Sequence, residues 1–309
     1  MYRYKLIAAA AAVMAWALAA HAASPALYRI GVSMHFMRDD YASAVVQSIK
    51  KTVASQPGAS VVVTDANGEA AKQLTDMENL VAQKVSAIIV IPIDEKAILT
   101  GIRRANAAGI PVVAITHIPN ATVVTTVAST GDFTNGKASG QLLRERLHDQ
   151  GKIAVIDMPY SLWRIDERER GLKEALAGSH IEIVAHQAGT EQAKIQDIVA
   201  GLLIAHPDLA GIWCSYSNQV VGAADALRQA GRRNVVLTGI DADHSIIERI
   251  EKGWVTGTAA QFPREHGRLA AEAALNQLTG KPVQASYEVP VGVVTKGNAR
   301  DMERRIWNE

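Results

Sequence analysis

The stretch AKQLTDMENLVAQKVSAIIVIPID, residues 71–94, decides the fold class, because it joins an amphipathic helix to a wholly apolar strand. Leu74, Met77 and Val81 recur at spacings of three and four, which predicts a helix over 70–84 with one buried face. The run AIIVI at 87–91 predicts a strand that is covered on both faces. A helix that leads directly into such a strand is typical of a parallel α/β sheet.

The same alternation of strand and helix continues outward from this stretch in both directions. We expect further strands at 28–34, 60–65, 112–116, 123–129, 152–157, 181–185, 211–214, 235–240, 256–261 and 283–291. We expect further helices from about residue 40 and at 95–108, 133–148, 167–177, 194–205, 219–230 and 263–278. These elements form two sets, which predicts an α/β protein with two doubly wound lobes. No long linker separates the sets, so we expect several chain crossings and a hinge.

Bulk composition limits the class of protein further. The chain has 309 residues, which allows one large or two medium domains. The formal charge of +1 leaves no strongly basic surface, so we expect no nucleic-acid partner. Cys214 is the single cysteine, which excludes an intrachain disulfide and a cysteine metal cluster.

Residues 1–22 have the pattern of a secretory signal peptide. Arg3 and Lys5 precede an apolar run over 6–20, and the AHA that ends this segment is a cleavage site. A membrane anchor is the alternative, but an apolar run of fifteen residues is short for a bilayer. No cysteine stands near the cleavage site, so we expect no lipid anchor there. We therefore expect a soluble protein that is exported to a bacterial periplasm and begins at Ala23.

Polar and aromatic side chains follow the predicted strands, at the point where each strand ends. In open parallel sheets, ligands bind outside the carboxyl ends of the strands. The residues found there are 35–41 (HFMRDDY), Asp65, Asn67, Pro92, Asp94, Thr116, His117, Tyr160, Trp163, Arg164, Arg168, Tyr216, Asn218, Asp241, Asp243 and Gln261. Charged groups bind hydroxyl groups strongly, and aromatic faces cover apolar C–H surface. The set predicts a site for a polar small molecule such as a sugar or a polyol.

Several of these residues have a structural alternative. Asp39, Asp40, Asp94 and Asp243 stand where helices begin, which favours N-capping over ligand contact. The charged segment RIDERER at 164–170 is typical of a mostly solvated helix face.

The chain shows no motif of a metal site, a cofactor site or an enzyme. His180, His186 and His266 lack partners at ligand spacing, so we expect no metal. A G-x-S-x-G turn, a Walker A lysine loop and a G-x-G-x-x-G after the first strand do not occur. We therefore expect no catalytic residue and no cofactor. An exported enzyme would need a constellation outside these motifs and would be marked by turnover of its bound ligand.

Longer strings in both halves of the chain are more specific than single residues. They are IGVSM with DDY (30–41), the quoted 71–94, ERERGLKEAL, LLIAHPDLAGIW, GAADALRQAG and GIDADHSIIERIEKGWVTGTAAQ (239–261). Together they resemble the periplasmic sugar-binding proteins of bacterial ABC transporters, in the ribose, galactose and inositol-binding branch of the type I periplasmic binding proteins. The resemblance covers nearly all of the mature chain.

The resemblance implies an architecture of two Rossmann-like lobes joined by a hinge of three chain crossings, which enclose the ligand when the hinge closes. The crossings would fall near Thr130, Gln261 and Val289. The N-terminal lobe would comprise residues 23–129 plus 262–288, and the C-terminal lobe 130–261 plus 289–309.

The resemblance also implies ligand contacts. Arg168, Asp241 and Gln261 have the same residue type as family contacts at matching positions. Tyr41 matches an aromatic residue that stacks on the sugar ring. Asp241 would accept hydrogen bonds from ligand hydroxyl groups.

At three matching positions the chain departs from the family. The family often has asparagine in place of Ile91, Asp-Arg or Asn-Arg in place of Thr116-His117, and Asn-Asp in place of Tyr216-Ser217. These changes remove hydrogen-bonding groups, so the usual ligand's hydroxyl groups would be buried without partners. We therefore expect a deoxy sugar, a polyol or another modified compound as readily as a standard sugar.

Ten residues are therefore predicted to bind the ligand. They are His35, Tyr41, Ile91, Thr116, His117, Trp163, Arg168, Tyr216, Asp241 and Gln261. We expect a monomer that captures a sugar or polyol-like solute by hinge closure and delivers it to a membrane ABC permease. The alternative is a periplasmic sensor that presents its solute to a chemoreceptor or a sensor kinase. A transcriptional repressor of related fold would need a helix-turn-helix where the signal segment stands.

Overall fold

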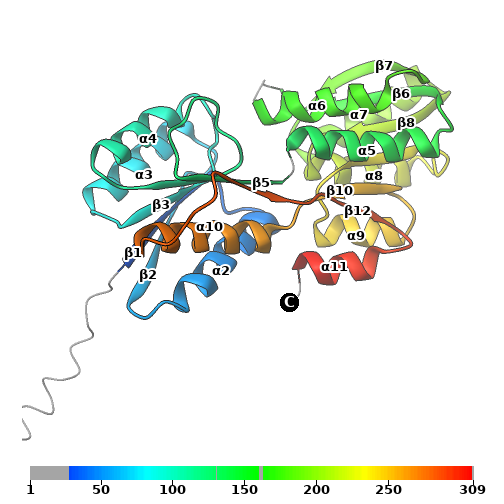
Figure 1. Cartoon of the computed structure of the whole chain (residues 1–309). Helices are drawn as coiled ribbons and strands as arrows, with labels where there is room; N and C mark the ends of the chain where they lie inside the picture. The colour runs from blue at the N-terminus through cyan, green and yellow to red at the C-terminus, as the bar shows by residue number, and fades with distance from the viewer. Residues whose placement is uncertain (1–27, 130, 160–162, 308–309) are drawn as a thin grey trace, which may run out of the picture.

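The computed structural model describes residues 28–129, 131–159 and 163–307, which form two six-stranded sheets (Figure 1). The first sheet contains β1 (Tyr28–Met34), β2 (Ala59–Asp65), β3 (Ala87–Val90), β4 (Val112–Ile115), β5 (Thr125–Ser129) and β11 (Ser286–Val289). Its order is β11-β5-β4-β3-β1-β2, and all its pairs are parallel. Because β1 lies inside the sheet, the strand order reverses between β1 and β3.

The second sheet repeats this arrangement. It contains β6 (Gln150–Asp157), β7 (His180–Ala188), β8 (Leu209–Cys214), β9 (Val236–Ile240), β10 (Gly257–Ala260) and β12 (Gly292–Thr295). Its order is β12-β10-β9-β8-β6-β7, and β12 is the strand that pairs antiparallel. Each sheet therefore has a point of strand-order reversal, where the ends of neighbouring strands open a crevice.

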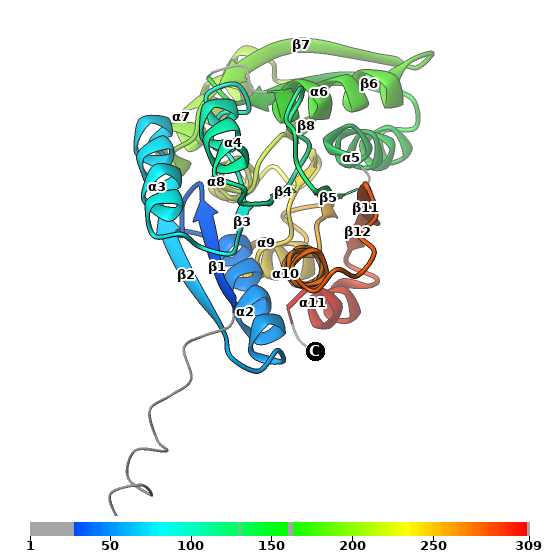
Figure 2. The same ribbon diagram turned by 60° about the vertical axis from the view of Figure 1, so that its left-hand side comes forward.

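Helices cover both faces of each sheet. In the first lobe, α2 (Asp40–Ala54) and α10 (Pro263–Leu278) lie side by side on one face, and α3 (Ala70–Ala82) and α4 (Ile98–Ala107) cover the other (Figure 2). In the second lobe the helices are α5 (Asp132–Arg146), α6 (Trp163–Leu176), α7 (Gln192–Ala205), α8 (Ser217–Gln229), α9 (His244–Glu251) and α11 (Ala299–Trp307). Burial on both faces explains the continuous apolar runs of the central strands.

The helix predicted from the opening stretch has the packing that its spacing requires. Met77 and Leu80 are fully buried against Ile98 and Ile102 of α4. Burying side chains of this size stabilises the fold by about 1.5–3 kcal/mol each. In the part of the chain that the structure describes, no helix is both long enough and apolar enough to cross a membrane. The predicted signal segment, residues 1–22, lies outside the described residues.

The chain passes between the two sheets three times, after β5, after β10 and between β11 and β12. The crossing predicted near Thr130 falls on a residue outside the described part. The lobe boundaries given above remain predictions.

The structure differs from the prediction at two places in the C-terminal region. The single strand expected over 283–291 is two strands, β11 and β12, which flank Pro290 and belong to different sheets. An extended run has the same alternation whichever sheet it joins, so the pattern could not show the change. The pattern also missed α11, whose buried residues Met302, Ile306 and Trp307 form only a short apolar face.

Candidate ligand site between the two lobes

A cavity of about 390 Å³ lies between the lobes, at the carboxyl ends of strands from both sheets. This volume falls in the range of ordinary small-molecule sites. Its wall combines aromatic, aliphatic and charged side chains, so the cavity can cover apolar surface and also hydrogen-bond polar groups.

Most of the predicted site residues meet at this cavity. Eight of the ten line it: His35, Tyr41, Ile91, Thr116, Arg168, Tyr216, Asp241 and Gln261. His117 follows β4 but is exposed and is not among the lining residues. Trp163 begins α6, and its side chain falls outside the described part. The roles of these residues in binding remain predictions.

The capping alternatives had different outcomes. Asp39 accepts a hydrogen bond from the Ala42 amide at 2.7 Å, which confirms it as the N-cap of α2. Asp94 accepts from the amides of Lys96 and Ala97 before α4. Asp243 stands at the N-cap position of α9 but makes no side-chain cap bond, so that prediction was wrong. Its carboxyl group lines the cavity instead.

Arg168 is the best-enclosed cation of the cavity wall. Its Nε donates to Asp132 Oδ1 at 2.8 Å, and a terminal nitrogen donates to the Ser215 carbonyl oxygen at 2.9 Å. The residue is only 6% exposed. Burial by itself would lower the pKa of Arg168, but Asp132 and Asp241 outweigh burial and raise it. The mostly solvated face predicted for 164–170 is therefore wrong for this residue.

Sequence spacing also missed a histidine on the cavity wall. His266 of α10 is 1% exposed, and its Nδ1 lies 2.9 Å from the Tyr41 hydroxyl oxygen. Burial lowers the pKa of His266 to about 4, so its ring is neutral at pH 7. The two residues are 225 positions apart, and no local pattern could have paired them.

Two residues on the wall hold left-handed backbone conformations. Thr116 after β4 has φ +97°, and Asp241 after β9 has φ +79°. Their amides donate to Val127 and Ala259 on the neighbouring strands. Such conformations cost energy for residues with a Cβ, most of all for a β-branched threonine, and they concentrate at functional sites. The turns at these two strand ends are therefore held by the surrounding sheet.

Burial and mutual repulsion control the charges in the cavity. Burial raises the pKa of Asp39 to about 6, and repulsion from Asp241 adds to this rise. Burial and the same neighbour raise the pKa of Asp243 to about 8. Burial, assisted by the positive charge of Arg164, lowers the pKa of His35 to about 3. At neutral pH the His35 ring is therefore uncharged.

Arg164 joins the two lobes. One of its terminal nitrogens lies 2.9 Å from Glu95 Oε1 and 3.4 Å from the carbonyl oxygens of Pro92 and Ile93. Arg164 belongs to α6 of the second lobe, whereas the other three belong to the first lobe. The Glu95 side chain is 5% exposed, so water screens this ion pair little. The contact holds the lobes together beside the cavity.

Glu95→Gln is expected to weaken binding of the solute by about tenfold, or 1.4 kcal/mol. The variant removes the charge of a contact that must separate when the lobes open, so the closed state becomes less populated. Calorimetric titration measures the effect. Glu78→Gln is the control, because Glu78 pairs with Arg104 inside the first lobe. Equal affinities in the two variants would show that the Arg164 contact does not contribute to closure.

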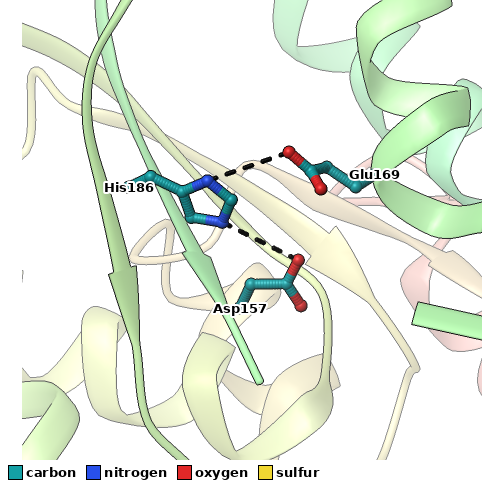
Figure 3. Close-up of side chains that lie close together, drawn as sticks. All are labelled: Asp157, Glu169 and His186. Carbon is teal, nitrogen blue, oxygen red and sulfur yellow. Dashed lines mark ion pairs between the residues drawn. The ribbon is translucent and has the colours of Figure 1, made fainter. Parts of the chain in front are cut away.

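A second cluster of titratable groups lies outside the cavity wall (Figure 3). Figure 3 shows the His186 ring between two carboxylates. Its Nε2 lies 3.9 Å from Asp157 Oδ2, and its Nδ1 lies 3.8 Å from Glu169 Oε1. The imidazole presents a different nitrogen to each carboxylate, whereas a metal ligand uses one nitrogen toward the ion. Asp157 also accepts hydrogen bonds from Ser215 and the Met158 amide. This arrangement suits a bridging imidazole better than a metal centre.

The fold and the cavity agree with one known family. The family profile described as "Periplasmic binding protein domain" matches residues 30–282. The chain therefore belongs to the periplasmic binding protein family. The ribose import binding protein of Bacillus subtilis (strain 168) is 27% identical over 282 residues, covering 91% of this chain and 92% of that protein.

Solved structures show the same fold. A periplasmic solute binding protein of an ABC transporter from Actinobacillus succinogenes 130z, with bound D-allose, has a TM-score of 0.82 and 25% identity, covering 89% of this chain and 99% of that one. A solute binding protein from Bacillus halodurans C-125, with bound myo-inositol, has a TM-score of 0.85 and 22% identity, covering 91% and 99%. The predicted two-lobe α/β fold and the predicted resemblance are confirmed.

Proposed function

We propose that this protein is the solute-binding component of an ABC importer, which captures a sugar or polyol-like molecule between its lobes and delivers it to a membrane permease. The observation that carries the proposal is the cavity itself, because both lobes supply its polar side chains. Tyr41 and Thr116 come from the first lobe, and Arg168, Tyr216 and Asp241 come from the second. A ligand that contacts both sets stabilises the closed arrangement.

The relatives support this solute class. The Bacillus subtilis relative is named for ribose import, and the two solved structures hold D-allose and myo-inositol. The signal pattern of residues 1–22 supports action in the periplasm. Binding and release by hinge motion neither form nor break a covalent bond. We therefore propose a binding protein rather than an enzyme, and we propose that it acts as a monomer.

A thermal-shift screen followed by calorimetry tests the proposal. The chain from Ala23 is screened against pentoses, hexoses, deoxy sugars, polyols and cyclitols. A ligand at a hundred times its dissociation constant stabilises the native state by about 2.7 kcal/mol, which a melting curve detects. The expected result is a saturable shift with at least one compound and no turnover of that compound.

Asp241→Asn is the matched variant for that screen. Asparagine keeps the size of the side chain and tolerates the left-handed backbone at this position, but it loses the charge. Binding of the hit should weaken by more than about tenfold, because a charge-assisted acceptor contributes roughly 1.5–3 kcal/mol. The absence of a thermal shift with every compound would contradict the proposed solute class. An unchanged affinity in Asp241→Asn would show that Asp241 does not contact the solute.

A further inference from the structure

Three carboxylates gather at the cavity from the two lobes. Asp39 precedes α2 in the first lobe, whereas Asp241 and Asp243 follow β9 in the second. They lie close enough for Asp241 to repel both of the others, and for Asp39 to repel Asp243. Among the described residues, none of the three forms an ion pair.

Two of the three arginines on the cavity wall are paired with other carboxylates. Arg164 pairs with Glu95 at 2.9 Å, and Arg168 pairs with Asp132 at 2.8 Å. Arg168 also attracts Asp241, but one guanidinium cannot neutralise two carboxylates. Arg38 is exposed and lies over the Phe36 ring, 5.5 Å from its centre. The cluster therefore keeps an excess of negative charge when all three groups ionise.

Hydrogen bonds hold the cluster in place. One oxygen of Asp39 accepts from the Ala42 amide, and one oxygen of Asp241 accepts from Gln261 at 2.8 Å. The Ser217 side chain lies close enough to Asp243 to oppose the rise in the pKa of that carboxyl group. The second oxygen of Asp39 lies 3.5 Å from the Tyr216 hydroxyl oxygen across the lobe boundary. Preorganised acceptors of this kind lose little entropy when a donor binds.

The same cavity contains a buried polar atom that lacks a partner. His35 lines the wall and is 9% exposed, and its Nδ1 has no hydrogen-bond partner within the described residues. Buried polar atoms of native proteins are nearly always paired, so an orphan on a cavity wall points to a ligand. The ring is neutral at pH 7 and can exchange a hydrogen bond with a polar group of a solute.

We propose that the solute carries a protonated amino group, held by Asp39, Asp241 and Asp243, in addition to its hydroxyl groups. This inference rests on the proposed function and narrows its ligand class to amino sugars, amino polyols or aminocyclitols. A hydroxyl group brings one donor and no charge, so the repulsion among the enclosed carboxylates would remain. An ammonium group brings three donors and a full positive charge, which offsets the repulsion.

Calorimetric titration with matched ligand pairs tests the inference. The pairs are D-glucosamine with D-glucose, D-glucamine with D-glucitol, and an aminodeoxy-inositol with the parent inositol. All titrations contain EDTA, and a separate titration without EDTA uses Ca²⁺ alone. In at least one pair, the amine should bind at least thirtyfold more tightly than its hydroxyl counterpart.

Binding of the amine should also release protons. The cluster must ionise fully to accept a cation, so Asp243, whose pKa burial raises to about 8, gives up its proton. Affinity for the amine should then rise between pH 6 and pH 8, while affinity for the hydroxyl counterpart should not. Titration in buffers with different ionisation enthalpies measures the release. The titratable groups around Asp243 are Asp39, Asp40, Tyr216, Asp241 and the adjacent His244.

Asp243→Asn tests whether the carboxylate cluster, rather than the overall charge of the protein, favours the amine. It removes one charge at constant size, and the ratio of the two dissociation constants within a pair should fall at least tenfold. Asp197→Asn is the control, because this variant removes the same charge from an exposed residue of α7 that does not line the cavity. In that variant the ratio should change less than twofold.

The outcomes separate this inference from the proposed function. Hydroxyl compounds that bind as tightly as their amine counterparts would overturn the amine and leave solute capture intact. Saturable Ca²⁺ binding that Asp243→Asn abolishes would assign the cluster to a divalent cation and overturn the amine. Failure of every compound in all three pairs would count against both the inference and the sugar or polyol class.

Discussion

Arg168→Met is expected to lower the free energy of unfolding by about 3–5 kcal/mol and to reduce solute affinity below detection in a standard calorimetric titration. The guanidinium is buried, pairs with Asp132 and donates to the Ser215 carbonyl oxygen. Its removal leaves the Asp132 carboxylate enclosed without a cation, since that side chain is only 12% exposed. The cavity also loses a positive charge that attracts Asp241. Urea denaturation measures the first effect and calorimetry the second.

Arg249→Met is the control for this expectation. Arg249 makes a bidentate ion pair with Asp225 in the same lobe, but its side chain is 21% exposed and is not among the cavity-lining residues. A partly solvated pair contributes about 1 kcal/mol or less, and its loss should leave solute affinity unchanged. Equal losses of stability in the two variants would show that the Arg168 network is no stronger than a surface pair.

Gly136→Ala is expected to lower the free energy of unfolding by about 3 kcal/mol or more, because it forces apart two helices that touch through their backbones. A Cβ at Gly136 of α5 would overlap the carbonyl oxygen of Arg168 in α6, and one at Gly171 of α6 would overlap the carbonyl oxygen of Phe133. Neither backbone can yield without moving its helix. Because α6 carries the Arg168 guanidinium, the variant should also weaken solute binding. Urea denaturation and calorimetry again report the two effects.

Gly201→Ala provides the matched control for the helix contact. Gly201 is an exposed residue of α7, and a Cβ there would meet no atom within 4 Å. Alanine is the better helix former, so this variant should raise the free energy of unfolding by about 0.5–1 kcal/mol. A stable Gly136→Ala protein with normal affinity would mean that α5 and α6 can separate without disturbing Arg168.

The secondary structure was largely predictable because its causes are local. Spacing of apolar residues located α3 and β3 to within two residues at each end. The same spacing placed polar groups at strand ends, and parallel pairing brought eight of the ten predicted residues to one cavity. The extended run that contains β11 and β12 changes sheets between the two strands, and the local pattern did not indicate this change.

The properties of the site depended on distant parts of the chain. Tyr41 meets His266 across 225 positions, and Arg164 meets Glu95 across 69. The segment 164–170 has the composition of a solvated helix, yet Arg168 is buried because α5 packs directly against it. Composition could not distinguish the exposed Arg170 from the enclosed Arg168.

The sequence by itself determined the α/β class, the two sets of strands and helices, and the positions at strand ends where a ligand could bind. Periodicity and secondary-structure propensity depend on a few neighbouring residues, so both can be read from the amino-acid sequence. Only the tertiary structure decided which carboxylates meet, which cations are already paired and which groups keep their protons. Those properties follow from burial and from charges a few ångströms apart in space, and neither quantity is a function of separation along the chain.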